Sequence, residues 1–169
     1  MHERKIDYRI AVITVSTSRF EKYGNLRGLK NIPEDDESGK EIINAFEGRV
    51  VDYCLVADDL LQIRAAIFDL LKNADVCILT GGTGLSPRDL TIEAVEGFFD
   101  KKINGFGEIF RIQSFKEIGY AAILSRATAG IIAGKVVFCL PGSKKAVKLG
   151  LEIIKSSLNH ILTHAKGLA

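Results

Sequence analysis

Several features that would assign this sequence of 169 residues to a specialised class of protein are missing from it. Its apolar stretches are only as long as strands, which excludes a membrane-spanning helix. No basic run is long enough to follow a nucleic-acid backbone, and a net charge of +2 favours no particular partner, so nucleic-acid binding is not expected. The first eight residues are charged and contain no apolar signal core, which predicts a cytoplasmic protein.

Cysteine and histidine are also scarce, with three of each. The cysteines lie inside apolar, strand-like runs and have no second cysteine or histidine at metal-ligand spacing. They are therefore interpreted as buried, reduced thiols. His160 and His164 share one helical face, and a solvated helix end is preferred over a metal site there. No Ser-His-Asp or Cys-His arrangement indicates a nucleophilic enzyme. The cysteines are Cys54, Cys77 and Cys139.

The composition that remains is that of an ordinary globular protein, with 47% hydrophobic and 26% charged residues. A chain of this length is expected to form one domain, residues 1–169. Strand-like runs alternate with helix-like stretches, which predicts an α/β fold: three layers built on a doubly wound, mainly parallel sheet. The expected strands are 9–16, 49–56, 76–80, 128–132 and 136–140, and the last two form one antiparallel pair.

Capping residues predict where the helices begin. Between the first strand and the first predicted helix, residues 20–37 show little periodicity and are interpreted as a lid, a mobile insertion or a disordered segment. Residues 103–111 are expected to form a loop that enters a helix, and 119–125 are ambiguous. The predicted N-caps are Ser38 (with Glu41 completing a capping box), Asp59 and Thr91, and a further helix is expected to follow residues 141–143.

The rest of the chain is organised around residues 76–91. A short apolar run ends there at the glycine loop, residues 81–84 (Gly-Gly-Thr-Gly), where missing Cβ atoms let backbone N–H groups turn inward. A tight turn without a ligand is the simpler interpretation of the glycines alone. Arg88 and Asp89 follow closely, and a predicted helix start comes next, so the combination favours an anion-binding corner.

Polar or glycine-rich residues follow four of the expected strands: Ser16, Asp58, the glycine loop with Asp89, and 142–143. In a doubly wound sheet, ligands bind beyond the carboxyl ends of the strands, so these residues are expected to meet. A carboxylate repels a phosphate unless a cation lies between them, and Mg²⁺ binds one or two carboxylates together with substrate phosphates. The pattern therefore predicts metal-assisted phosphoryl or nucleotidyl transfer, with Asp58 and Asp89 as metal ligands. Taken singly, each could instead be a helix cap or an ion-pair partner.

Five motifs occur in order along the chain: TGGTG at 80–84, RDLTIEA at 88–94, GFGEIFR at 105–111, SRA at 125–127 and LPGS at 140–143. Together they resemble the signatures of the molybdopterin adenylyltransferases, the MogA/MoaB proteins of molybdenum-cofactor biosynthesis. The MoaB branch is the more similar. The resemblance extends from about residue 10 to the end of the chain, and five ordered motifs are far more specific than any one of them.

The resemblance implies a MoaB/Mog-like domain that assembles as a trimer or hexamer. It implies Mg²⁺-dependent adenylylation of molybdopterin by ATP with release of pyrophosphate, and hand-over of the product to a molybdate- or tungstate-inserting enzyme. Asp58 and Asp89 match positions implied to be catalytic and metal-binding. With Ser16 added from the strand-end argument, the candidate nucleotide- and pterin-binding residues are Ser16, Gly81, Gly82, Thr83, Gly84, Glu108, Arg111, Ser114, Ser125, Gly142 and Ser143.

The sequence departs from the family pattern at three places. Lys144 and Lys145 stand where a proline is common, so the shape of a second possible anion-binding corner, at residues 142–143, stays open. Ala57 also stands where a proline is common. The 20–37 segment is longer than in compact members of the family. The main alternative is a non-catalytic molybdopterin-binding or scaffolding module of the same pathway, since a fold does not fix a function. Another pterin- or nucleotide-processing enzyme of the same fold is a third hypothesis. The presence of both Asp58 and Asp89 favours the adenylyltransferase.

Overall fold

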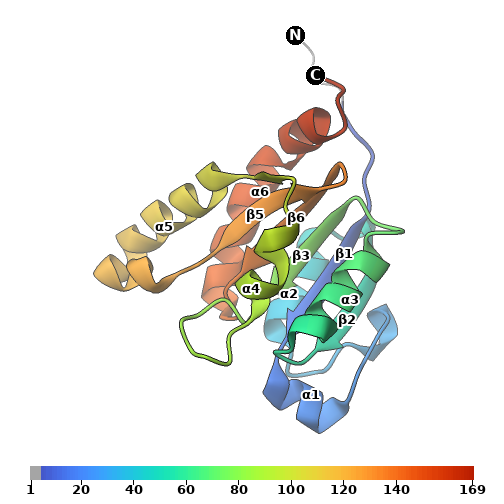
Figure 1. Cartoon of the computed structure of the whole chain (residues 1–169), viewed down its shortest axis with the longest axis vertical. Coiled ribbons are helices and arrows are strands. Elements are labelled where there is room, and N and C mark those ends of the chain that lie inside the picture. The colour runs from blue at the N-terminus through green and yellow to red at the C-terminus, as the bar shows by residue number, and fades with distance from the viewer. Residues whose placement is uncertain (1–4) are drawn as a thin grey trace.

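A computed structural model describes residues 5–169 and places six strands in one sheet (Figure 1). The order across the sheet is β2-β1-β3-β6-β5-β4. The first four of these are mutually parallel, whereas β5 is antiparallel to β6 and β4 is antiparallel to β5. The predicted mainly parallel sheet with an antiparallel pair is confirmed. The strands are β1 (Ile10–Val15), β2 (Val50–Val56), β3 (Val76–Thr80), β4 (Lys101–Lys102), β5 (Thr128–Ile132) and β6 (Lys135–Leu140).

Helices cover both faces of the sheet, which completes the three layers. One face packs against α2, α5 and α6, and the other packs against α3 and α4. Because both faces are covered, every residue of β1 and β3 is buried, and their sequences read as continuous apolar runs. None of the helices in the described part of the chain is both long and apolar enough to cross a membrane. The helices are α1 (Thr17–Tyr23), α2 (Glu37–Ala45), α3 (Leu60–Leu70), α4 (Thr91–Val95), α5 (Asn104–Ile118) and α6 (Lys144–Ala165), with short 3₁₀ turns η1 (Leu29–Asn31), η2 (Glu96–Phe98) and η3 (Gly119–Leu124).

The segment 20–37 is ordered, so the expectation of a mobile insertion or of disorder is wrong. After α1 the chain runs beside β2, which is an edge strand of the sheet. The N–H of Leu55 donates to the carbonyl of Leu26 (2.9 Å), and the N–H of Gly28 donates to the carbonyl of Tyr53 (2.8 Å). These bonds join residues that are far apart in the sequence, so no local periodicity predicts them. The segment covers the edge of the sheet.

The capping box predicted at Ser38 is wrong, because Asp36 caps α2. The Asp36 carboxylate is fully buried and accepts a hydrogen bond from the N–H of Gly39 (2.9 Å). It also accepts bonds from the hydroxyls of Thr14 (2.7 Å) and Tyr53 (2.6 Å). Two of these three donors come from neighbouring strands, so the choice between Asp36 and Ser38 depends on tertiary contacts.

The predicted N-cap at Thr91 is also wrong, since this residue is the first residue of α4 and its side chain does not cap the helix. Its hydroxyl donates to the carbonyl of Gly81 (2.8 Å), and its N–H donates to the carbonyl of Gly82 (2.9 Å). Thr91 therefore ties the short helix α4 to the glycine loop.

Residues 103–111 are mostly helical rather than a loop, because α5 already begins at Asn104. Because glycine has a low helix propensity, the two glycines in the first turn made the sequence look like a loop. At Gly107 the missing Cβ makes room for the guanidinium of Arg111 and the carbonyl of Ala127. Packing contacts therefore explain a glycine that propensity alone would place in a loop.

The predicted cap at Asp59, the helix expected after residues 141–143 and the interpretation of the cysteines are confirmed. Asp59 accepts a hydrogen bond from the N–H of Gln62 (2.8 Å) at the start of α3, and Ser143 accepts one from Ala146 (3.2 Å) at the start of α6. All three cysteines are free and buried. Burial raises the pKa of the Cys139 thiol to about 12, so it stays protonated near neutral pH.

Candidate functional site

The carboxyl ends of β1, β3 and β6 meet at Gly81, at the lower edge of the sheet in Figure 1. The N–H of Gly81 donates to the carbonyl of Leu140 (3.0 Å). A Cβ at Gly81 would overlap the carbonyl oxygen of Val15, and a Cβ at Gly142 would lie 3.4 Å from the Cα of Gly81. The φ angle of Gly81 is +95°, in the region that favours glycine. Gly81 is therefore the point where three strand ends come into contact.

Asp58 follows β2 and lies against the glycine loop. Its Oδ2 accepts bonds from the hydroxyl (2.8 Å) and the N–H (3.3 Å) of Thr17, the first residue of α1. Its Oδ1 is buried without a hydrogen-bond partner among the described residues, and a Cβ at Gly82 would lie 2.8 Å from it. Because Asp59 caps α3, a capping role does not account for Asp58. A buried carboxylate oxygen without a donor is a favourable position for a cation.

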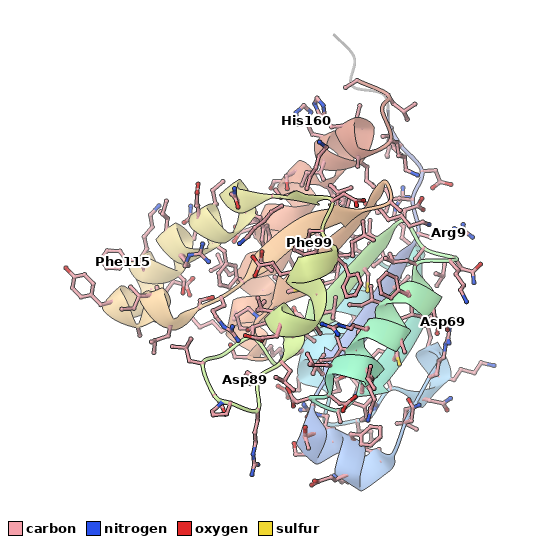
Figure 2. The ribbon with its side chains drawn as sticks, in the orientation of Figure 1. Arg9, Asp69, Asp89, Phe99, Phe115 and His160 are labelled. Atoms are coloured by element: carbon pink, nitrogen blue, oxygen red, sulfur yellow. The ribbon has the colours of Figure 1, made fainter. Side chains whose placement is uncertain are left out.

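Asp89 lies at the other end of the glycine loop, between β3 and α4 (Figure 2). Its Oδ2 accepts a bond from the N–H of Ser86 (3.1 Å), and a Cβ at Gly84 would lie 2.6 Å from the same oxygen. Among residues 5–169 no ion pair joins Asp89 to Arg88, the partner considered from the sequence. Asp58 and Asp89 thus approach one loop two residues apart, at Gly82 and Gly84, and we call this loop with the neighbouring strand ends the rim.

Most of the predicted binding residues line one cavity of about 420 Å³, which we call the glycine-loop cavity. The ends of β3 and β6 contribute glycines and hydroxyl groups to its lining. The helix α5 and the turn η3 contribute Ser114 and the apolar side chains of Phe110, Ile118 and Leu124. The predicted residues that it brings together are Gly81, Gly82, Thr83, Gly84, Asp89, Ser114, Ser125, Gly142 and Ser143.

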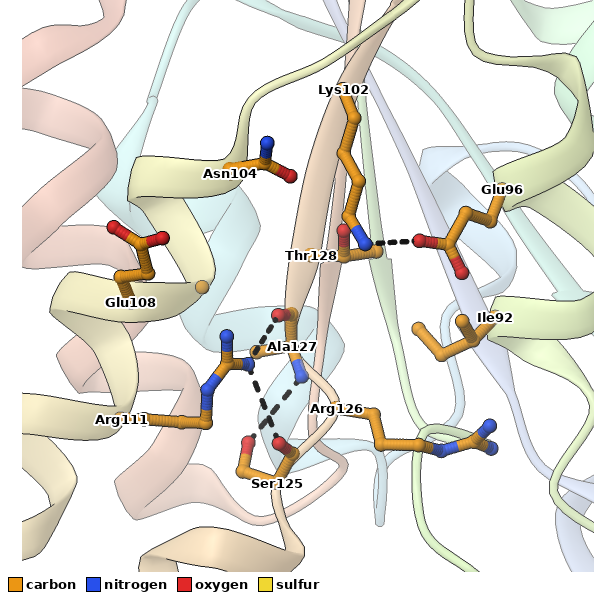
Figure 3. Close-up of a pocket in the computed structure, with 11 residues that line it drawn as sticks. Ile92, Glu96, Lys102, Asn104, Glu108, Arg111, Ser125, Arg126, Ala127 and Thr128 are labelled. Carbon is orange, nitrogen blue, oxygen red and sulfur yellow. Dashed lines mark hydrogen bonds and ion pairs between the residues drawn. The ribbon is translucent and has the colours of Figure 1, made fainter.

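Ser16 and Asp58 are not among the residues that line this cavity. Ser16 has another role. It caps α1 by accepting a hydrogen bond from the N–H of Arg19 (3.3 Å), and its hydroxyl lies 3.3 Å from that of Ser18. Glu108 and Arg111 line a second cavity of about 320 Å³ (Figure 3), which we call the α5 cavity. The single cavity expected from the sequence is therefore two cavities.

The two cavities adjoin at Ser125, which lines both. The guanidinium of Arg111 donates to the carbonyls of Ala127 (3.2 Å) and Ser125 (3.5 Å), so it holds this segment against α5 (Figure 3). Lys102 and Glu96 form an ion pair at another side of the α5 cavity.

The second anion corner lies at the start of α6, where Ser143 is the N-cap. Ser38 of α2 donates to the carbonyl of Gly142 (2.7 Å), and Thr80 donates to the carbonyl of Pro141 (3.0 Å). The helix begins directly at Lys144, so the absence of the common proline does not prevent capping. The N–H groups at the start of a helix this long, together with the neighbouring lysines, favour an anion.

Arg126 is a site residue that sequence reasoning missed. It lies in the SRA motif, and its Nε and Nη2 donate to the carbonyls of Thr83 (3.2 Å) and Gly84 (2.6 Å). Its guanidinium also pairs with Glu93, and this hydrogen bond holds the pKa of the Glu93 carboxyl below its ordinary value. Arg126 therefore fixes the glycine loop from the segment that precedes β5. The sequence did contain a hint of this role, because Arg126 lies in the SRA motif and Glu93, its ion-pair partner, lies in the RDLTIEA motif.

The polar groups at this rim suit a magnesium ion bound together with phosphates better than a metal ion whose ligands all come from the protein. No group of three or more metal-binding side chains lies together anywhere in residues 5–169. Mg²⁺ does not need one, because it keeps several waters and uses substrate phosphates as ligands. The glycine loop and the corner at Ser143 would hold phosphates, and Asp58 and Asp89 would hold the cation. This arrangement can position and neutralise a transferring phosphate.

Comparison with known proteins places the chain among proteins of one pathway. Residues 11–160 match the family model described as "Probable molybdopterin binding domain". The molybdopterin adenylyltransferase of Pyrococcus furiosus is 47% identical over 166 residues, which is 94% of this chain and 92% of that protein. The probable molybdopterin adenylyltransferase of Methanocaldococcus jannaschii is 40% identical over 168 residues, or 98% of this chain and 99% of that protein. The crystal structure of the tungsten cofactor synthesizing protein MoaB from Pyrococcus furiosus matches with a TM-score of 0.81 at 48% identity, and the match covers 94% of this chain and 96% of that one.

Proposed function

The chain belongs to the family described as probable molybdopterin binding domain, and from this membership we propose that it is a molybdopterin adenylyltransferase of molybdenum- or tungsten-cofactor biosynthesis. The two relatives at 47% and 40% identity carry that enzyme's name, and they align over more than nine-tenths of this chain. Further relatives are named for molybdenum cofactor biosynthesis, and a solved neighbour is named for the tungsten cofactor. The family resemblance drawn from the five motifs is confirmed.

The proposed reaction joins the phosphate of molybdopterin to the adenylyl group of ATP. A phosphate oxygen of molybdopterin attacks the α-phosphorus of ATP, the bond from that phosphorus to the α,β-bridging oxygen breaks, and pyrophosphate leaves. The observation that carries the proposal is the contact of Asp58 and Asp89 with one glycine loop, at Gly82 and Gly84. An enzyme of this class needs carboxylates and phosphate-binding amides side by side, whereas a scaffolding module does not.

Each part of the rim has a role in this proposal. The backbone N–H groups of the glycine loop and the N-terminus of α6 orient phosphate groups in line. Asp58, through its unpartnered Oδ1, and Asp89 would hold Mg²⁺. When bound, the ion neutralises phosphate charge. The apolar side chains of Phe110, Ile118 and Leu124 line the same cavity and would reduce the contact of bound phosphates with water.

Release of pyrophosphate tests the proposed activity directly. The purified protein, given ATP, Mg²⁺ and molybdopterin, is expected to release pyrophosphate and to form adenylylated molybdopterin in equal amounts. Omission of either Mg²⁺ or molybdopterin should abolish the release. Binding of molybdopterin without turnover would contradict the enzyme and support the scaffolding module.

Loss of the Asp58 carboxylate is expected to weaken the response to Mg²⁺. In Asp58→Ala, and in Asp58→Asn, which keeps an acceptor for Thr17, half-maximal activity should need about tenfold more Mg²⁺ or higher, because one charged ligand is gone. Pyrophosphate release measured across a Mg²⁺ titration checks this. Asp59→Asn is the matched control, since that carboxylate caps α3. An unchanged titration in both Asp58 variants would show that the residue only holds α1.

Removal of Arg126 is expected to lower kcat/KM about 100-fold, because the glycine loop loses its side-chain support and phosphates are misplaced. Initial rates of Arg126→Gln across ATP concentrations check this. The ion pair with Glu93 is partly exposed, so the melting temperature should change little. Arg27→Gln is the matched control, because Arg27 is likewise a partly exposed arginine in carboxylate ion pairs, with Asp52 and Asp69, but lies beside β2. Equal kinetics in the two variants would contradict a role in positioning the loop.

An exposed apolar surface on α5 and η3 supports assembly with further copies of the chain. Large apolar side chains at this surface are between 47% and 80% exposed. A patch of this kind on a folded protein indicates an interaction surface, and closed homo-oligomers are the commonest assemblies. We propose a trimer or hexamer, with hand-over of the product to a metal-inserting enzyme; a cytoplasmic location stays a prediction. The exposed residues are Ile109, Ile112, Phe115, Ile118, Tyr120, Ile123 and Leu124.

A further inference from the structure

Two hydroxyl groups hold the chain where it leaves β6 and enters α6. The hydroxyl of Thr80, the last residue of β3, donates to the carbonyl of Pro141 (3.0 Å). The hydroxyl of Ser38, on α2, donates to the carbonyl of Gly142 (2.7 Å). Both side chains are buried, with exposed fractions of 1% and 8%. Neither residue lines the glycine-loop cavity, so the two hydroxyls support this corner from behind.

Each of these bonds also fixes the direction of an N–H group. A peptide bond is planar, and in its trans form the C=O and the N–H point in opposite directions. All peptide bonds in the described part of the chain are trans. The peptide held by Thr80 carries the N–H of Gly142, and the peptide held by Ser38 carries the N–H of Ser143. Because Gly142 and Ser143 line the glycine-loop cavity, these N–H groups point away from the hydroxyls and toward that cavity.

The two N–H groups are available to a ligand. Among residues 5–169, neither the N–H of Gly142 nor that of Ser143 donates to another group. Backbone N–H groups ordinarily have a partner, and successive ones that face the same space suit an anion. A carbonyl that accepts a hydrogen bond also polarises its peptide, so the N–H on the opposite side becomes a stronger donor. The hydroxyls therefore both orient and strengthen these donors.

The position of Ser38 depends in turn on a buried carboxylate that the proposed reaction does not use. Asp36 caps α2 and is completely buried. Besides the N–H of Gly39, it accepts the hydroxyls of Thr14 on β1 (2.7 Å) and Tyr53 on β2 (2.6 Å). These bonds fix the first turn of α2 against the sheet. Asp36 thus holds Ser38 in place from the core, without lining the cavity itself.

We infer that Ser38 and Thr80 are positioning residues, which aim the N–H groups of Gly142 and Ser143 at a phosphate oxygen of the substrate. This inference rests on the proposed function, because that function places phosphates in the glycine-loop cavity. The hydroxyls do not touch the substrate. They fix the donors before binding, so that little reorganisation is needed when phosphate charge shifts during transfer.

Paired variants of Thr80 separate positioning from stability. Thr80→Val keeps the shape of the side chain and removes the hydroxyl, whereas Thr80→Ser keeps the hydroxyl and removes a methyl group. Both should lower the melting temperature, because one loses a hydrogen bond and the other loses packing contacts. The probe is inorganic pyrophosphate with Mg²⁺, titrated into the full-length protein by calorimetry. Its affinity is expected to fall about tenfold in Thr80→Val and to stay within about twofold in Thr80→Ser.

Ser38→Ala should repeat the loss seen in Thr80→Val, and each variant should lower kcat/KM for ATP about tenfold. Ser157→Ala is the matched control. The hydroxyl of Ser157 also donates to a carbonyl, that of Ile153 (2.8 Å), but Ser157 lines neither cavity. Its pyrophosphate affinity should equal that of the wild type.

Three results would overturn the inference: a wild-type protein that does not bind pyrophosphate, normal binding in both Ser38→Ala and Thr80→Val, or binding in Thr80→Ser as weak as in Thr80→Val. The last would show that affinity only follows stability. Wild-type release of pyrophosphate from ATP, with normal pyrophosphate binding in the variants that lack a hydroxyl, would remove only this inference. Hydroxyl-dependent binding of pyrophosphate without any turnover would remove the proposed function and leave the positioning role.

Discussion

Replacement of Asp89 by asparagine is expected to lower kcat about 100- to 1000-fold while ATP affinity changes by no more than about threefold. Asparagine keeps the shape of the side chain and an oxygen that can accept from Ser86, so the loop should retain its form. What is lost is one negative charge beside Gly84. The proposed metal ligand acts mainly where charge moves between phosphates, so the loss should appear in turnover rather than in ATP binding.

Steady-state pyrophosphate release and equilibrium ATP binding together measure the two effects on Asp89→Asn. Asp100→Asn is the matched control, because the carboxylate of Asp100 also accepts a backbone N–H, that of Ala133 (2.7 Å), but lies away from the glycine loop. The control should have wild-type kinetics. Losses of the same size in ATP binding and in turnover would assign Asp89 to nucleotide binding and contradict a role in the transfer step.

Replacement of Gly81 by alanine is expected to destabilise the fold by about 2–5 kcal/mol, a large part of the roughly 5–15 kcal/mol that stabilises a typical domain. Two costs add. A residue with a Cβ at φ +95° is strained by about 1–2 kcal/mol. The new Cβ would also overlap the carbonyl oxygen of Val15, which is backbone of a buried strand and cannot rotate away, and overpacking of this kind costs about 1–3 kcal/mol.

Urea unfolding followed by circular dichroism measures this loss, and two other glycines separate its causes. Gly24 has φ +76°, and a Cβ there would have no other atom within 4 Å, so Gly24→Ala should show the strain alone. Gly105 lies in α5 without a positive φ or a close contact, so Gly105→Ala should be neutral or slightly stabilising. If Gly81→Ala costs no more than Gly24→Ala, the contact between β1 and the glycine loop is not a tight one.

The interpretations that succeeded depend on neighbours in the sequence. The strand runs are apolar because both faces of the sheet are covered, and this is visible in each run by itself. Asp59 caps α3 through an N–H three residues ahead, which is a purely local interaction. The glycine loop was recognised because three of its four residues lack a Cβ atom at the end of a strand.

The interpretations that failed depend on contacts between distant segments. Asp36 is the cap of α2 because Thr14 and Tyr53, on two strands, also bind its carboxylate. The segment 20–37 is ordered by β2. Arg126 was missed because the carbonyls that it binds lie more than 40 residues earlier in the chain.

The sequence by itself determined the α/β class, the strands β1, β2, β3, β5 and β6, the family resemblance and the residue types at the strand ends, because each of these is encoded within short stretches. Only the tertiary structure decided which strand ends touch, that Asp58 and Asp89 contact one loop, and that Glu108 belongs to a separate cavity with Thr128. The physical reason is that cavities and unpaired buried atoms arise where segments distant in the sequence pack together, and no local pattern records that packing.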